Sequence, residues 1–204
     1  MPAPQPGILA PQPPLARSLF FSLRPDADPR PALLALAALA DGNRLMVGIG
    51  PALASALKAD IPGLHPLSPM SAHGVSVPST PRALWCWLRG TDRGELMNHA
   101  RQLEALLQPA FSLEQVLDTF MHRHDRDLTG YEDGTENPQG DDAGAAAIAS
   151  DGSSLVAMQQ WRHDFSAFER LSRNEQDNIV GRRRDDNEEL DDAPASAHVK
   201  RTAQ

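Results

Sequence analysis

The sequence predicts an α+β fold of the ferredoxin-like kind, an α/β sandwich in which helices cover one face of an antiparallel sheet. Two observations lead to this prediction. Up to about residue 122, apolar runs of strand length alternate with helical periodicity in the order strand, helix, strand, strand, helix, strand. After residue 150 a similar pattern begins again and supplies one strand and one helix. We therefore expect one complete ferredoxin-like domain and a second, incomplete ferredoxin-like domain.

The strands of the first domain are expected at short apolar runs that end in glycine, proline or charged residues. Four segments have this character: 15–23, 45–50, 83–89 and 111–122. The last of them is ambiguous, because its apolar residues fit either a strand or a helix. We favour a strand, since Pro109 precedes the segment and since the sheet then gains its fourth strand.

Helices are expected where apolar residues recur at helical spacing. The first contains Leu33, Leu36 and Ala40 and ends at Asp41 and the following glycine, a short second one follows Pro51, and a third begins near residue 92 and ends near 107. Asp92 is the expected N-cap of that third helix. Residues 60–82 are rich in proline and are expected to form a long ordered loop.

Beyond the first domain, 1–122, we expect a linker over 123–150 and an incomplete C-terminal domain over 151–204. Within the latter, the sequence predicts a strand over 154–164 and helical structure over 165–180. Ser172 and Glu175 have the spacing of a capping box that begins a second helical segment. The charged run that follows residue 180 is too polar for a core.

The composition excludes several classes of partner. There are 19 Lys and Arg residues against 27 Asp and Glu residues, and the formal net charge of -8 opposes binding to nucleic acid or to an anionic membrane surface. The single cysteine, Cys86, permits neither a disulfide framework nor a cysteine zinc site. No stretch reaches the roughly 18–20 apolar residues that span a bilayer, and the proline-rich start lacks the pattern of a signal peptide. We expect a cytoplasmic protein with no nucleic acid and no membrane partner.

The expected linker carries the segment GYEDGTENPQG, residues 130–140, with three carboxylates, three glycines and a proline. Counted from Asp125, its surroundings nearly match a twelve-residue calcium loop that ends at Glu136. Three features oppose that alternative: Glu132 stands where the loop packs an apolar residue, Pro138 prevents an exiting helix, and a strand precedes the segment. A solvated acidic turn is the other alternative drawn from the residues alone.

Residues 130–138 also resemble the signature G-x-x-D-G-T-E-N-P of the dye-decolourising peroxidases, a family of haem enzymes built from two ferredoxin-like domains. Five further segments agree with this family: 4–9, 20–25, 78–81, 159–164 and 197–201. The resemblance therefore covers nearly the whole chain. It implies an enzyme with one haem b per subunit, most often a homo-oligomer, which uses hydrogen peroxide to oxidise small aromatic or dye-like reductants.

The resemblance also implies roles for individual residues. His198 matches the proximal ligand of the haem iron, and Asp133 matches the distal group that accepts and returns a proton of the peroxide. Gly134 and Thr135 would contact the macrocycle. Arg182 matches a basic residue that would meet the haem propionates, and its alternative is a solvated surface charge.

One expected feature of the family is missing from this sequence. The distal arginine of these enzymes lies beyond the proximal histidine, and only six residues follow His198, of which Arg201 is too close to be the match. We therefore expect a C-terminally truncated peroxidase. The alternative function is a haem-binding or haem-handling protein without peroxidase turnover.

Overall fold

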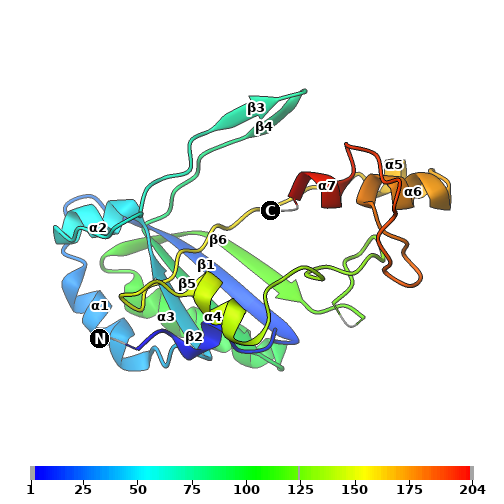
Figure 1. Cartoon of the computed structure of the whole chain (residues 1–204). Helices are drawn as coiled ribbons and strands as arrows, with labels where there is room; N and C mark the ends of the chain where they lie inside the picture. Colours follow the sequence, from blue (N-terminus) through cyan, green and yellow to red (C-terminus); the bar gives the residue numbers. More distant parts are fainter. Residues whose placement is uncertain (1–2, 124, 203–204) are drawn as a thin grey trace. The chain divides into compact units, whose positions relative to one another are not determined.

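The computed structural model describes residues 3–123 and 125–202. The chain divides into two compact units (Figure 1). The first unit comprises Met1–Phe120 with Gln139–Val156, and the second comprises Met121–Pro138 with Ala157–Gln204. The chain thus enters the second unit, returns to the first and enters the second again.

A four-stranded antiparallel sheet organises the first unit. Its strands are β1 (Leu15–Leu23), β2 (Leu45–Ile49), β5 (Leu84–Gly90) and β6 (Phe111–Phe120). They lie in the order β2-β5-β1-β6, so that the first and third strands of the predicted ferredoxin-like order occupy the centre. The ambiguous segment after Pro109 is a strand, and the prediction of a fourth strand is confirmed, since β6 pairs with β1 along its length.

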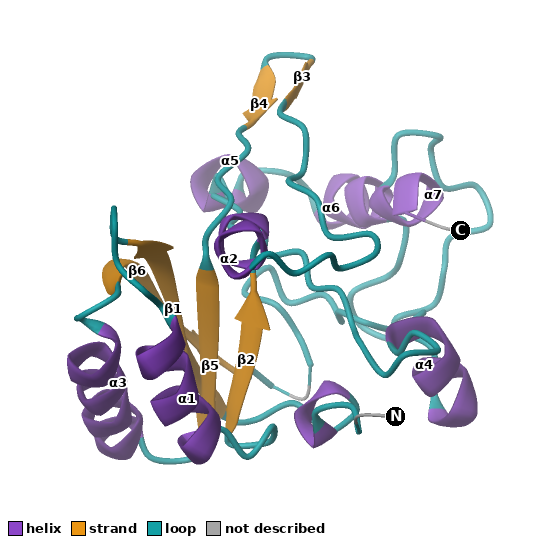
Figure 2. Ribbon diagram, turned by 90° about the vertical axis from the view of Figure 1, so that its left-hand side faces the viewer, coloured by secondary structure: helices purple, strands orange, loops and turns teal. Residues whose placement is uncertain are grey.

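Helices α1 (Arg30–Leu39) and α3 (Arg93–Leu107) lie side by side on one face of this sheet (Figure 2). Asp92 caps α3 as predicted, because its carboxylate accepts a hydrogen bond of 2.9 Å from the backbone N–H of Glu95. The core fills the space between these helices and the sheet. Its largest fully buried side chains include Leu19, Phe21, Leu36, Leu84, Leu107 and Phe111.

The first unit also contains smaller elements, of which only the short second helix was predicted. The loop expected over 60–82 contains a hairpin of β3 (Met70–Ala72) and β4 (Val75–Val77). His73 and Gly74 both have positive φ, 51° and 80°, as a two-residue hairpin turn requires. The connection near residue 140 contains α4 (Gly140–Ala147). A short 3₁₀ helix (Pro6–Ile8) and α2 (Pro51–Leu57), which matches the expected second helix, complete the unit.

The second unit has three short helices and, among its described residues, no paired strands of a sheet. The helices are α5 (Phe165–Glu169), α6 (Arg173–Val180) and α7 (His198–Thr202), and isolated bridges join Arg126 to Glu132 and Arg182 to Glu189. The predicted break between two helical segments is confirmed. Ser172 and Glu175 form the full capping box at the start of α6.

The strand predicted over 154–164 is wrong. This segment has no regular secondary structure, its side chains are exposed, and none of the described residues pairs with it in a ladder. A strand persists only where a neighbour satisfies its backbone groups, and sequence periodicity alone does not supply that neighbour.

Within the described ranges, no helix is both long enough and apolar enough to cross a membrane. The longest, α3, has 15 residues.

Candidate functional site

The acidic segment folds as a tight loop of the second unit, and we refer to residues 130–138 as the motif loop. Gly130 and Gly134 adopt φ values of 90° and 73°, a region that L side chains rarely enter. A Cβ on Gly134 would also lie 2.7 Å from the side-chain nitrogen of Asn137. The backbone N–H of Asn137 donates to the carbonyl of Gly134 across 3.0 Å. Both glycines are therefore required by the path of the loop.

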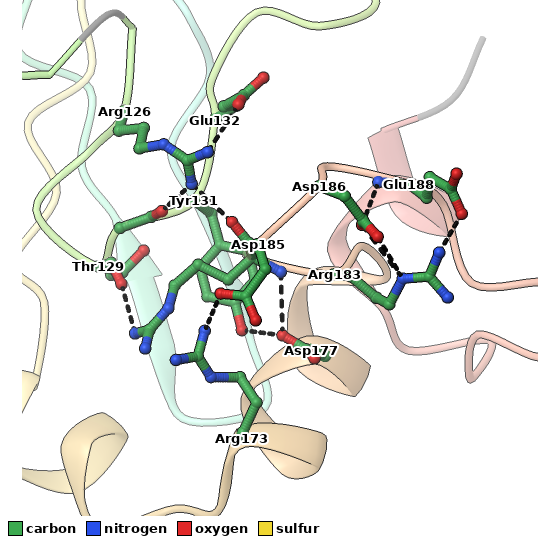
Figure 3. A network of polar contacts seen from close by, with 12 residues as sticks. Arg126, Thr129, Tyr131, Glu132, Arg173, Asp177, Arg183, Asp185, Asp186 and Glu188 are labelled. Atoms are coloured by element: carbon green, nitrogen blue, oxygen red, sulfur yellow. Dashed lines mark hydrogen bonds and ion pairs between the residues drawn. The ribbon is translucent and has the colours of Figure 1, made fainter.

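Tyr131 anchors the motif loop to α6. Its side chain is 4% exposed, and its hydroxyl donates a hydrogen bond of 2.5 Å to the Asp177 carboxylate (Figure 3). The ring packs edge to face against Phe168 of α5. Burial raises the pKa of Tyr131 well above its usual value, and the hydrogen bond to Asp177 raises it further. Tyr131 is thus held as a neutral phenol.

Arg126 fixes the other side of the loop. Its guanidinium donates to the carbonyls of Gly130 and Arg184 across 2.7 and 2.6 Å. It also pairs with the carboxylate of Glu132 at 2.8 Å (Figure 3). Three charge-assisted contacts from one side chain hold the segment after residue 180 against the motif loop.

Arg182 is buried, so it is not the solvated surface charge that was one alternative for it. The residue is 8% exposed, and its guanidinium donates to the carbonyl of Asn187 across 3.0 Å. It also pairs with Glu136 of the motif loop and, at 3.6 Å, with Glu189. The Arg182 side chain therefore joins the two segments that carry the predicted site residues.

An ion-pair chain continues from Arg182 to α7, the helix that begins at His198. Glu189 accepts a bond of 2.6 Å from Lys200 of α7. The hydrogen bond from Lys200 lowers the pKa of Glu189, and the Lys200 charge adds to this shift. We call the series Glu136, Arg182, Glu189 and Lys200 the ion-pair chain. It connects the motif loop to the element that carries the predicted iron ligand.

Thr135 belongs to a second connection between the same segments. Its hydroxyl oxygen accepts a hydrogen bond of 2.8 Å from the side-chain amide of Asn187. Asn187 has a φ of 61°, which asparagine tolerates better than most residues. Sequence reasoning missed Asn187, and its place in a charged run gave no signal of this contact.

Asp133 and His198 are both exposed. One Asp133 carboxylate oxygen accepts the backbone N–H of Gly134 across 2.9 Å, which orients the group. The His198 imidazole has no hydrogen-bond or ion-pair partner in the part of the chain that the structure describes. Among the described residues, no hydrogen bond or ion pair joins Asp133 to His198 directly; the link between their segments runs through the ion-pair chain and Thr135.

The calcium-loop alternative receives no support from this geometry. Glu136, its twelfth position, pairs with Arg182, and Glu132 pairs with Arg126. Over residues 3–123 and 125–202, no three His, Cys, Asp or Glu side chains converge as a metal site would require.

Comparison with known sequences finds proteins that are similar to this chain. Residues 124–204 match the sequence model described as Dyp-type peroxidase, C-terminal. The dye-decolorizing peroxidase of Rhodococcus erythropolis is 33% identical over 147 residues, which are 68% of this chain and 43% of that protein. The Mycobacterium tuberculosis protein of the same name is also 33% identical, over 67% of this chain and 43% of its own length. The chain thus spans less than half the length of these relatives.

Solved structures of the same type share the fold. A Dyp-type protein from Shewanella oneidensis superimposes with a TM-score of 0.87 at 26% identity, over 98% of this chain and 72% of that one. DyPB from Rhodococcus jostii gives a TM-score of 0.81 at 28% identity, over 97% and 71% of the two chains. Variants of DyPB have been solved in complex with heme. Sequence and fold together show that this chain belongs to the dye-decolourising peroxidase family.

Proposed function

We propose that the chain forms part of a haem-dependent peroxidase of the dye-decolourising type, which oxidises aromatic or dye-like reductants with hydrogen peroxide. The observation that carries the proposal is the anchored motif loop, which presents an oriented, exposed Asp133 in the same unit as an exposed His198. The heme complexes of the DyPB variants support haem as the cofactor.

The residues of the second unit fit a haem. A haem iron takes one neutral imidazole nitrogen from the protein in most peroxidases. The exposed His198 side chain has no competing partner among the described residues, so it is free to serve as that ligand. We propose one haem b per subunit, whose iron would activate the peroxide O–O bond when bound.

Asp133 would perform the proton transfers. A carboxylate in this position accepts the proton from one oxygen of hydrogen peroxide and returns it to the other, which then leaves as water. The N–H of Gly134 holds one carboxylate oxygen of Asp133 at 2.9 Å, and the other oxygen is left to take the proton.

Thr135 and Arg182 would contact the cofactor from positions fixed by their neighbours. Because Thr135 accepts its hydrogen bond from Asn187, its own O–H remains available as a donor. The terminal nitrogens of Arg182 are engaged by Glu136, Glu189 and the Asn187 carbonyl. These contacts use three of its five N–H groups, so the Nε–H and one N–H of Nη1 are the donors that would reach a propionate.

Two further properties complete the proposal. We propose a homo-oligomer, by analogy with the family. We also propose a cytoplasmic location, which a single buried, reduced Cys86 supports, because thiols persist in reducing compartments.

A turnover assay tests the proposal. The chain is loaded with haem, and peroxide-dependent bleaching of an anthraquinone dye is measured for the wild type and for Asp133→Asn. We expect kcat to fall by about 100-fold or more, since general acid–base groups contribute at least that factor, while the haem absorbance stays unchanged. Asp192→Asn, an exposed aspartate of the same unit, is the control. Full turnover by Asp133→Asn would overturn the proposed role, and haem uptake without any turnover would favour a haem-handling protein.

A further inference from the structure

The second unit contains a basic pocket of about 890 Å³ that none of the proposed haem residues lines. It lies between the start of the unit, the beginning of the motif loop, and the segments around residues 173 and 184. Its charged lining residues are Arg123, Arg126, Arg173, Arg184, Asp127 and Asp185. Four arginines face two aspartates there, in a chain whose net charge is -8. The pocket is thus positively charged although the chain as a whole is negatively charged.

Two of these arginines are held in place before any ligand arrives. Arg126 is fixed by the carbonyls of Gly130 and Arg184 and by Glu132. Arg184 donates to the carbonyl of Thr129 across 3.3 Å, and its guanidinium lies 6.0 Å from the centre of the Tyr131 ring. A guanidinium that is already oriented loses little conformational freedom when it binds an anion.

The two aspartates do not neutralise the pocket equally. One carboxylate oxygen of Asp127 accepts hydrogen bonds from the backbone N–H and the hydroxyl of Thr129, at 2.8 and 2.5 Å. Asp127 thereby stabilises the turn in which it lies. Asp185 pairs with Arg173 at 3.5 Å, and its side chain is 88% exposed. An ion pair so exposed contributes little, so an external anion can replace the Asp185 carboxylate at Arg173.

We propose that this pocket binds a small oxyanion of the phosphate or sulfonate type. Arginine suits such groups because its planar fork of N–H donors matches their oxygen atoms and keeps its charge at all relevant pH values. The anion would contact Arg173 and Arg184 and displace Asp185. The ligand is either the free inorganic ion or the anionic end of an organic molecule, and the proposal is independent of haem and of peroxidase activity.

Calorimetric titration of the full chain, without haem, tests the inference with inorganic phosphate and with phenyl phosphate as probes. We expect saturable binding that weakens as sodium chloride is added. Arg173→Gln should weaken it about tenfold, as the loss of one charge-assisted contact does. Asp185→Asn should tighten it, because the competing carboxylate is gone. Arg170→Gln, an exposed arginine of the same unit outside the pocket, should leave it unchanged.

The two probes separate the two sources of the ligand. Tighter binding of phosphate than of phenyl phosphate identifies the free ion, and tighter binding of phenyl phosphate identifies the anionic end of an organic molecule. Circular dichroism of each variant checks that it is folded, and the gain expected for Asp185→Asn is a result that misfolding cannot produce. Absence of saturable binding by either probe would overturn the inference, as would equal affinities of the wild type, Arg173→Gln and Asp185→Asn.

Discussion

Arg182 and Glu136 form an ion pair that joins a buried side chain to an exposed one. The Arg182 side chain is 10% exposed and that of Glu136 is 81% exposed. The pair ties the motif loop to the segment that leads into α7, and Arg182 extends the tie through Glu189 to Lys200. Because the two proposed haem-facing residues, Asp133 and His198, have no direct contact in the described part, their relative placement depends on such connections.

The first prediction concerns the stability that Arg182 provides. Arg182→Met should lower the free energy of unfolding by about 1–3 kcal/mol, because the charged hydrogen bond to the Asn187 carbonyl is lost. The carboxylates of Glu136 and Glu189 become hydrated when Arg182 is removed, so the loss of these two ion pairs adds little to the change. Urea unfolding followed by circular dichroism measures the change. Arg183→Met, an exposed neighbour, should change it much less, and equal effects of the two substitutions would contradict the role of burial.

The second prediction concerns Tyr131, the only tyrosine of the chain. Its raised pKa means that the stability it contributes is fully present below about pH 10, the ordinary tyrosine pKa, and declines as the pH rises toward the folded value. Ultraviolet titration should therefore show no tyrosinate at pH 10 in the folded chain. Asp177→Asn should lower the midpoint without restoring the ordinary value, because burial remains. Normal titration of Tyr131 in the folded wild type would refute this environment.

The third prediction concerns the loss of the ion-pair chain at acidic pH. The pKa of Glu189 is lowered, chiefly by the hydrogen bond from Lys200. The link from Glu189 to α7 is therefore intact above the ordinary glutamate pKa of about 4.3. It is lost as the pH falls through the lowered pKa of Glu189. Amide exchange of α7, corrected for its intrinsic pH dependence, should accelerate in that range. Glu189→Gln should remove the pH dependence, whereas Glu188→Gln should keep it. Identical profiles of all three proteins would exclude the ion-pair chain as the cause.

The fourth prediction concerns Cys86, whose side chain is fully buried in β5. Burial raises its pKa to about 12, so the reactive thiolate is nearly absent at neutral pH. A thiol-specific disulfide reagent should leave the folded chain unmodified for hours and should modify one thiol at once in denaturant. Rapid modification under native conditions would show that the first unit opens readily.

Much of the first unit could be predicted from the sequence, because its elements follow local rules. Asp92 caps α3 by a contact three residues away, as Ser172 does for α6 of the second unit, and the apolar runs mark the strands. The hairpin at His73 was missed, although its following glycine was a signal for the turn. The prediction of a strand over 154–164 failed because a strand needs a neighbouring strand to pair with, and the local sequence pattern does not specify that neighbour.

The candidate site could be predicted only in part. The motif named the segment and the residue types, but the partners of Tyr131 and Arg182 lie 46 residues away in the chain, at Asp177 and Glu136. No periodicity encodes contacts at that separation. For the same reason, the sequence does not predict the basic pocket around Arg173 and Arg184, whose lining residues come from separate segments of the chain.

The most direct test of the account is a haem titration of the full chain in which His198 is compared with a second exposed histidine of the same unit. The wild type should bind one haem per chain and develop the Soret absorbance of a histidine-bound iron. His198→Ala should bind more than about tenfold more weakly, since loss of even an outer partner of a metal ligand costs that much, and His163→Ala should behave as the wild type does. Equal affinity and an unchanged spectrum for His198→Ala would contradict the central claim that His198 holds the haem.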